Sequence, residues 1–442
     1  MGGEKRTPIN VCSPIERIRD FREVVKGYSR EEAIEEAKRC LKCKKPACVP
    51  SCPVGQRIPE YIAAIAEGNF DKALGIIMEN NPLPGVCGRV CTKKCETTCV
   101  RGKKGEPIAI HLLKRAAADF GKVELRPLAA TGKRVAVVGS GPAGLALSFK
   151  LALRGHGVTI FEQKPVAGGM MALCIPPYRL PRDVLDADIR RITDLGVNIQ
   201  LNSPINRERG VDELFAEGYD AVFLGLGTLK PKSLGIPGEE LEGVEHVIPF
   251  LESVNLRGRT KVGKRVAVVG AGYSAMDAVR TARRLGAEAF IVYRRMREQM
   301  PASQEEVREA EEEGCSLNLL VNPIRVLGKD GKVAGLECVR MELGPPDNSG
   351  RPAPIPIKGS EFRIECDMLI QAISQEPDLS GFKPGEFRLT KWNTLEVSET
   401  MQTSRRGVWA AGDVVTGPQT IAAAIAGANR AAEDILHFLK GA

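Results

Sequence analysis

Eight of the 13 cysteines are spaced as ligands of metal clusters. They form two groups of four: Cys40, Cys43, Cys48 and Cys52, then Cys87, Cys91, Cys95 and Cys99. Eight thiolates are the ligand set of two [4Fe–4S] clusters, and a cysteine followed by proline, like Cys52, often ligates the other cluster of a pair. The spacing predicts that Cys40, Cys43 and Cys48 share one cluster with a residue of the second group, and that Cys52 joins the remainder. Structural zinc is the alternative, although zinc usually pairs two CxxC units and only one such spacing occurs here.

A glycine-rich loop predicts a first dinucleotide site. The stretch KRVAVVG reads as a short apolar strand and leads into Gly139-x-Gly141-x-x-Gly144, which opens a helix. Such glycines allow a tight turn, close approach of a pyrophosphate and close helix–strand packing, while the helix N-terminus attracts the phosphates. Glu162 ends the next strand, where a carboxylate can bind both ribose hydroxyls of an adenosine and would repel a 2′-phosphate. The site therefore suits FAD or NAD rather than NADP.

A second copy of this pattern predicts an NADP(H) site. The string KRVAVVG recurs from Lys264 and continues into Gly270-x-Gly272-x-x-Ala275. Arg294 and Arg295 stand where the first unit has Glu162, and guanidinium groups favour a 2′-phosphate by charge and by bidentate geometry. The alternatives are that both loops are ordinary glycine turns and that the two arginines are solvated surface charges.

A third element supports FAD at the first site. Gly412 and Asp413 follow the apolar stretch GVWAA and precede a loop and an alanine-rich helix. An aspartate so placed can meet the ribityl chain or the pyrophosphate, and a helix N-terminus aimed at the flavin stabilises its anionic reduced form. A capping aspartate is the alternative. The remaining candidate cofactor-binding residues are Pro142, Ala143, Gly169, Met170, Arg179, Gly227, Thr228, Tyr273, Ser274, Thr420 and Ile421. No general acid or base is assigned.

Composition excludes several other classes. The 442 residues, 43% hydrophobic and 27% charged, suit roughly three globular domains. The net charge of +8 is spread along the chain and aromatic residues are only 5%, so nucleic-acid binding is not indicated. No apolar run approaches the roughly 18 residues that would span a bilayer. The N-terminus lacks the apolar stretch of a signal peptide, and we expect a cytoplasmic protein.

Local signals predict the elements that carry these residues. Ser29 and Glu32 form a capping box that opens a helix running toward Cys40. Two further helices are expected at about 59–67 and 70–78. The proline-rich segment 344–356 is expected to be a surface loop.

Together these motifs resemble the small (β) subunit of bacterial glutamate synthase and its relatives. Among these are the large subunit of NADH-dependent ferredoxin:NADP oxidoreductase, sulfide dehydrogenase and the N-terminal half of dihydropyrimidine dehydrogenase. The likeness covers nearly the whole chain and is carried by RCLKCKKPACVPSCPV, NPLPGVCGRVC, VAVVGSGPAGLALS, GGMMALCIPPYRLP, GAGYSAMDA, VYRRMREQMPA and GVWAAGDVV. It implies an α/β protein in which an all-α domain with two [4Fe–4S] clusters precedes two Rossmann-like domains. The expected boundaries are 1–125 for the cluster domain, 126–255 and 376–442 for the FAD domain, and 256–375 for an inserted NADP(H) domain.

The resemblance also implies a ligand set. In relatives the first cluster is completed by the residue that aligns with Cys99, and the second takes the equivalents of Cys52, Cys91 and Cys95. A carboxylate or amide from the following helix often completes the second cluster, but Lys114 aligns at that position and lysine is no ligand. Two candidates therefore remain for the fourth ligand of the second cluster: Cys87 and a non-cysteine residue such as His111. Cys174 replaces a usual glycine beside the flavin loop, and packing is the favoured interpretation.

The implied function is electron transfer. NADPH would reduce FAD by hydride transfer, and electrons would then pass singly to the clusters and to a partner protein. Expected partners are a glutamate synthase large subunit or a ferredoxin- or NAD-linked flavoprotein. The alternative is a non-catalytic electron-relay or scaffold subunit, for which the departure at Tyr273 and Ser274 from the usual asparagine is the only support.

Overall fold

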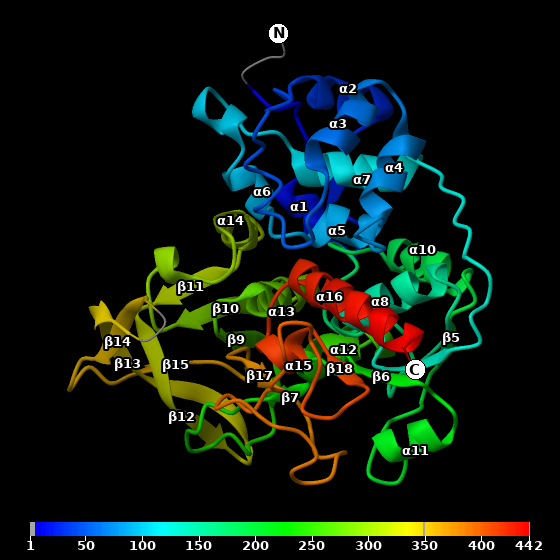
Figure 1. Ribbon diagram of the computed structural model, residues 1–442. Coiled ribbons are helices and arrows are strands. Elements are labelled where there is room, and N and C mark those ends of the chain that lie inside the picture. Colours follow the sequence, from blue (N-terminus) through cyan, green and yellow to red (C-terminus); the bar gives the residue numbers. More distant parts are fainter. Residues whose placement is uncertain (1–4, 348–349, 442) are drawn as a thin grey trace.

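The computed structural model describes residues 5–347 and 350–441 of the chain. Figure 1 shows a helical N-terminal domain at the top of the view and two sheet-containing parts beneath it. The long C-terminal helix lies in the middle of the molecule, between the helical domain and the sheets. Among the described residues, no helix is both long enough and apolar enough to cross a membrane.

The N-terminal domain is almost entirely helical, as predicted. A short ribbon pairs β1 (Asn10–Val11) with β2 (Val25–Gly27). The helices are α1 (Pro14–Arg17), α2 (Arg30–Lys38), α3 (Ile58–Ala66), α4 (Phe70–Met78), α5 (Pro84–Val90), α6 (Lys94–Thr97), a 3-10 turn at Val100–Lys103 and α7 (Ile110–Phe120). The capping box predicted for α2 is present, with Ser29 and Glu32 each accepting the other's backbone N–H. Apolar faces of α3, α4 and α7 form the core of this domain.

A five-stranded parallel sheet follows. Its strands, in spatial order, are β18 (Val408–Ala410), β6 (Ala221–Leu224), β3 (Arg134–Val138), β4 (Gly157–Phe161) and β5 (Asn198–Gln200). Its helices are α8 (Pro142–Leu153), α9 (Met170–Leu173), α10 (Arg182–Thr193), α11 (Val211–Ala216), α15 (Asp413–Thr416) and α16 (Ile421–Lys440). Four of the five residues of β3 and all of β6 are buried, because helices cover both faces, and this explains their uninterrupted apolar sequence.

A second parallel sheet repeats the plan. Its order is β11 (Ser316–Leu319), β10 (Glu288–Tyr293), β9 (Arg265–Val269), β16 (Met368–Gln371) and β8 (Val244–His246). The associated helices are α12 (Val247–Arg257), α13 (Tyr273–Arg284), a 3-10 turn at Arg297–Gln299 and α14 (Gln304–Glu312). Since β8 and α12 belong to this sheet and its core, the second part begins before Val244, earlier than the boundary expected after residue 255.

Two short strands mark where the chain enters and leaves this second part. β7 (Lys230–Pro231) pairs antiparallel with β17 (Gln375–Glu376). The chain returns to the first part at Gln375, next to the position where the boundary was predicted. The paired crossovers place the second sheet as an insertion between β6 and β18 of the first.

The prediction of a surface loop at 344–356 is wrong for most of this segment. Its first residues end β13 (Lys332–Pro346), and its last form β14 (Pro352–Pro356); residues 348 and 349 lie outside the described part. With β12 (Val321–Lys329) and β15 (Phe362–Ile364), these strands make an antiparallel sheet with β14 at its edge. Prolines at alternate positions are tolerated on an edge strand because their missing N–H groups need not join a ladder.

Candidate functional site

One large cavity gathers most of the residues predicted to bind the first dinucleotide. It has a volume of about 610 Å³ and lies at the carboxyl ends of the strands of the first sheet. The predicted residues that line it are Gly139, Gly141, Pro142, Ala143, Glu162, Gly169, Met170, Gly227, Thr228, Gly412, Asp413, Thr420 and Ile421. A cavity of this size and position is typical of a cofactor site in an open α/β sheet.

The three glycines of the first loop have the geometry that a pyrophosphate requires. Gly139 has φ +96°, and a Cβ there would lie 2.5 Å from the carbonyl oxygen of Gly225. Gly144 is not among the residues that line the cavity, and a Cβ on it would meet the oxygen of Gly139 at 2.0 Å. A Cβ on Gly141, by contrast, would project into open space with no atom within 4 Å. Helix α8 begins next to it without a side-chain cap, so its N–H groups are available to phosphate oxygens.

Two predicted carboxylates, Glu162 and Asp413, line this cavity. Glu162 accepts hydrogen bonds from the backbone and hydroxyl of Ser140 (2.9 and 2.6 Å) and from the Lys164 N–H (2.8 Å). Asp413 accepts the Gln419 N–H at 3.0 Å, and burial raises the pKa of its carboxyl to about 6. Asp413 does not cap a helix, because Gly412 is the N-cap of α15 and Thr420 caps α16; instead it lines the cavity together with Thr420. These contacts support the fit of the cavity to the adenosine and the ribityl parts of FAD.

Sequence reasoning missed part of the cavity wall. Gly225, Lys164, Asn206 and the segment 378–382 also line it. Gly225 follows strand β6 directly and could have been recognised from the Gly-x-Gly-Thr run that ends at Thr228. The other contacts come from loops far apart in the sequence, and no local signal identifies them.

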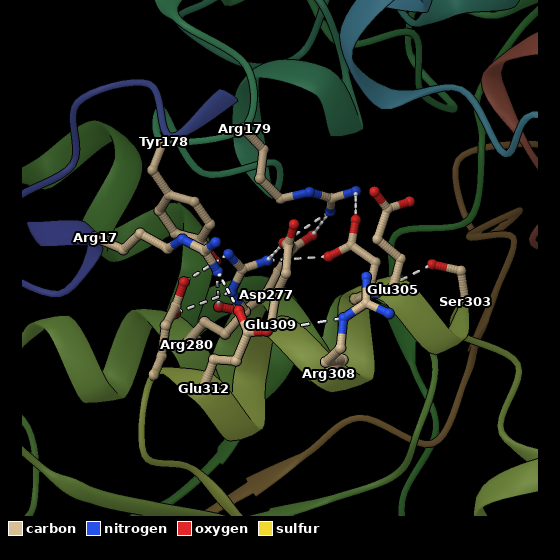
Figure 2. Close-up of polar contacts among 12 residues, drawn as sticks. Arg17, Tyr178, Arg179, Asp277, Arg280, Ser303, Glu305, Arg308, Glu309 and Glu312 are labelled. Carbon is tan, nitrogen blue, oxygen red and sulfur yellow. Dashed lines mark hydrogen bonds and ion pairs between the residues drawn. The ribbon is translucent and has the colours of Figure 1, made fainter. Parts of the chain in front are cut away.

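Arg179, a predicted cofactor residue, does not line the cavity. Its guanidinium donates to both carboxylate oxygens of Asp277 at 2.7 Å and pairs with Glu306 at 2.7 Å. Figure 2 shows it reaching from the α9–α10 connection to the acidic helix α14, beside Arg280 and Glu309. Burial raises the pKa of Asp277 to about 6, although the Arg179 charge opposes this shift. Arg179 thus joins the two sheet-containing parts.

The second glycine loop repeats the geometry of the first. Gly270 has φ +135°, and a Cβ there would lie 2.2 Å from the oxygen of Ala372. A Cβ on Gly272 would have no atom within 4 Å. Tyr273 and Ser274 open α13 without a side-chain cap, and Ala275 is fully buried where the helix packs on the sheet. The loop can therefore receive a pyrophosphate in the same way.

The two arginines after β10 have different environments. Arg294 is exposed. Arg295 is buried, donating to the Pro352 oxygen at 2.8 Å and pairing with Asp347 at 2.5 Å. Only Arg294 is thus directly accessible to a ligand in this arrangement, whereas Arg295 also holds the β13–β14 hairpin over the strand end.

The eight cysteines separate into two hollows of four. Cys40, Cys43, Cys48 and Cys99 line the first, beside α3. Burial and the neighbouring thiols raise the pKa of Cys48 to about 11. Cys52, Cys87, Cys91 and Cys95 line the second, together with Lys114. All 13 cysteines are free thiols. Within residues 5–347 and 350–441, no three Cys, His, Asp or Glu side chains are grouped closely enough to hold a single metal ion.

The donor sets fit [4Fe–4S] clusters, in which each thiolate binds a different iron. The first set is the one implied by the resemblance, with Cys99 as its fourth member. His111 lies outside the second hollow, and its Nδ1 lies 2.7 Å from the Glu96 carboxylate. Cys174 is buried in the second core and does not line the large cavity, in agreement with packing.

The three chambers are adjacent. Ile421 lines the large cavity, and the next residue, Ala422, lines the second cysteine hollow. Ile58 lines both cysteine hollows. A group in the large cavity, a cluster in the second hollow and a cluster in the first would therefore follow one another through the molecule.

Known protein families match both halves of the chain. A family described as pyridine nucleotide-disulphide oxidoreductase matches residues 133–428, and one described as dihydropyrimidine dehydrogenase domain II, 4Fe-4S cluster, matches residues 17–124. The second match favours clusters over zinc. The chain is 33% identical over 453 residues to the small chain of the NADPH glutamate synthase of Escherichia coli K12, covering 95% of this chain and 94% of that protein.

Two further proteins are similar. The chain is 44% identical over 425 residues to the β subunit of the NADP(+)-dependent formate dehydrogenase of Moorella thermoacetica; the match covers 89% of this chain but only 60% of that protein. The fold resembles that of Mycobacterium tuberculosis FprA in complex with NADPH, with a TM-score of 0.60, 18% identity and coverage of 72% of this chain and 85% of that one. At this identity the likeness shows the fold alone.

Proposed function

Because the chain belongs to the pyridine nucleotide-disulphide oxidoreductase family and carries an N-terminal [4Fe–4S] domain, we propose that it is an NADP(H)-dependent flavin and iron–sulfur oxidoreductase subunit. The observation that carries this proposal is the adjacency of the large cavity to the second cysteine hollow through Ile421 and Ala422. The chain would connect a two-electron carrier to one-electron centres.

The residues of the large cavity bind and orient FAD. The N–H groups of α8 and the open face of Gly141 hold the pyrophosphate, and Glu162 holds the adenosine ribose. The N-terminus of α16, capped by Thr420, faces the same cavity. Its partial positive charge favours negative charge on a bound ring.

The second glycine loop binds NADP(H). Gly272 and the uncapped start of α13 hold the pyrophosphate, and Arg294 meets the 2′-phosphate. When bound, FAD exchanges a hydride with NADP(H) and single electrons with [4Fe–4S] clusters. The protein positions these groups and excludes water. The intact open position at Gly272 supports nucleotide binding over the alternative of a non-catalytic relay subunit.

We infer that the subunit works with a partner protein in the cytoplasm. Its relatives include a glutamate synthase small chain and a formate dehydrogenase β subunit, whose names describe parts of larger assemblies. The partner is a redox protein such as a glutamate synthase large subunit or a ferredoxin- or NAD-linked flavoprotein.

The test is anaerobic titration of the protein as isolated with NADPH. Loss of the flavin absorbance, followed by electron paramagnetic resonance (EPR) signals of reduced clusters, supports the proposal. A flavin that stays oxidised with excess NADPH rejects it. The matched control is Gly272→Val, which fills the open position: it is expected to keep FAD and the fold but to weaken NADPH binding at least about tenfold, or 1.4 kcal/mol.

A further inference from the structure

We propose that Cys87 is the fourth ligand of the second cluster and that Lys114 is the buried cation that balances its charge. The inference rests on the proposed function only in requiring that the N-terminal domain binds clusters. It assigns this cluster four thiolates, in place of three thiolates and a carboxylate or amide.

The backbone brings Cys87 to the other three cysteines. Helix α5 carries Cys87 one turn before Cys91, and both line the hollow that also contains Cys52 and Cys95. Gly88 lets α5 approach α7 closely, because a Cβ at this position would lie 2.6 Å from the Arg115 Cα. This approach places Cys87 in the same hollow as Lys114, which precedes Arg115 on α7. Cys87 itself is only 3% exposed.

No acidic side chain or histidine competes for this position. Among the described residues that line the hollow there is no Asp, Glu or His. Two amides line it. The Asn81 Oδ1 already accepts the Leu83 N–H, whereas Gln56 donates its Nε2 to the Ile77 oxygen and its buried Oε1 has no partner among the described residues. A thiolate is the usual ligand of iron in such clusters, so Cys87 is the better donor.

Lys114 is a buried cation whose nearest source of negative charge among the lining residues is the group of cysteines. Its side chain is 6% exposed, and within the described residues no ion pair with a carboxylate involves it. An isolated ammonium in such a place costs several kcal/mol. The negative groups that act on it are Cys91, Cys87, Cys52 and Cys95. The negative charge of four thiolates exceeds the positive charge of the cluster core. The assembled cluster is therefore an anion, and it can pair with the Lys114 ammonium.

Buried hydrogen-bond donors around the second cysteine hollow also support a cluster there. The Tyr61 hydroxyl and the Asn81 Nδ2 are buried and have no hydrogen-bond partner within the described structure. Both can donate to cluster sulfur atoms. Asn81 lies against Cys87, where its amide favours the thiolate, although burial raises the pKa of that thiol to about 12. Asn81 is thus the donor placed at the sulfur that the proposal adds, whereas Tyr61 lies among the other cysteines of the site.

The test compares variants of the full-length protein isolated anaerobically. Iron per flavin and the EPR spectrum of the reduced protein are measured for the wild type, Cys87→Ser, Gln56→Leu and Cys12→Ser. Cys12 lies in the same domain but outside both hollows, and its substitution is the control. Cys87→Ser is expected to lower iron from about eight toward about four per flavin, with loss of one cluster signal. Gln56→Leu and Cys12→Ser are expected to retain both signals.

A rescue separates ligation from folding. Lys114→Glu added to Cys87→Ser supplies a carboxylate from α7 and is expected to restore iron and the lost signal. Lys114→Met alone keeps all thiolates but removes the charge, and it is expected to lower the midpoint potential of this cluster while its iron stays bound. A merely structural lysine would leave that potential unchanged.

Two results overturn the inference. One is a Cys87→Ser protein with the iron content and both signals of Cys12→Ser; the other is loss of the cluster in Gln56→Leu instead. In either case NADPH reduction of the wild-type flavin can still proceed, so the proposed function would stand. A wild type that holds both clusters but whose flavin NADPH does not reduce would reject the function alone.

Discussion

Ile421 and Ala422, consecutive residues in the first turn of α16, face different chambers. Ile421 lines the large cavity, and Ala422 lines the hollow of Cys52, Cys87, Cys91 and Cys95. One helical turn therefore separates the proposed flavin from the proposed cluster. The small side chain of Ala422 sets how closely a group in the cysteine hollow can approach this turn.

Enlarging Ala422 is expected to slow electron transfer between flavin and cluster. In Ala422→Leu the added atoms enter the cysteine hollow, where overpacking costs about 1–3 kcal/mol and pushes neighbours apart. Stopped-flow reduction of the flavin by NADPH should be unchanged, whereas rapid-freeze EPR should show clusters reduced severalfold more slowly. Ala423→Leu, one residue further and in neither chamber, should match the wild type; an equal effect of both substitutions would contradict this role.

The two arginines after β10 are expected to respond differently to substitution. Arg294 is exposed, so Arg294→Gln should weaken NADPH about 10- to 100-fold by removing a charge-assisted phosphate contact, with little effect on NADH. Arg295 holds Asp347 and the Pro352 oxygen, so Arg295→Gln should also lower the melting temperature. The measurements are kcat/KM for both nucleotides and thermal unfolding. If neither variant loses its preference for NADPH over NADH, the 2′-phosphate binds elsewhere.

Sequence patterns predicted the features that depend on near neighbours. The strand–glycine–helix units around Gly141 and Gly272 and the box of Ser29 and Glu32 are each set within a few residues. Hydrophobic runs revealed β3 and β9 because strands buried on both faces are apolar throughout.

The features that were not predicted correctly depend on residues that are far apart in the sequence. Pro352–Pro356 was expected to be a loop because prolines break structure locally, but its pairing with β13 makes it an edge strand. Arg179 precedes its partners Asp277 and Glu306 by about a hundred residues, and nothing near it in sequence indicates an ion pair between domains. The early start of the second sheet at Val244 follows from pairing with β16, which lies far ahead in the chain.

Breaking the Arg179 pair is expected to loosen the contact between the two sheet-containing parts. Arg179→Met leaves the buried Asp277 carboxylate without its guanidinium, which costs about 3–5 kcal/mol. The melting temperature should fall, and the rate of flavin reduction at saturating NADPH should fall with it. Adding Asp277→Asn removes the stranded charge and should recover much of the stability. If the double variant is no more stable than Arg179→Met, the pair does not act as proposed.

Asp188 is expected to make stability depend on pH. Its carboxylate, on α10, accepts the Val86 N–H at 2.9 Å and so ties the first sheet's helices to α5 of the cluster domain. Burial raises its pKa from the ordinary 3.8 to about 7. The folded protein therefore binds this proton more tightly than the unfolded chain, and the resulting stability is full below about pH 4 and lost as pH rises to about 7.

Asp188→Asn removes that titration. Relative to the variant, the wild type should lose about 1–3 kcal/mol of unfolding free energy between pH 5 and pH 8. The measurement is the melting temperature of both proteins at each pH, and the difference between them should change. Asp186→Asn, exposed on the same helix, should show no such change. A wild-type advantage that grows with pH would mean that Asp188 is ionised in the folded protein, held by Arg191 and the N-terminus of α5.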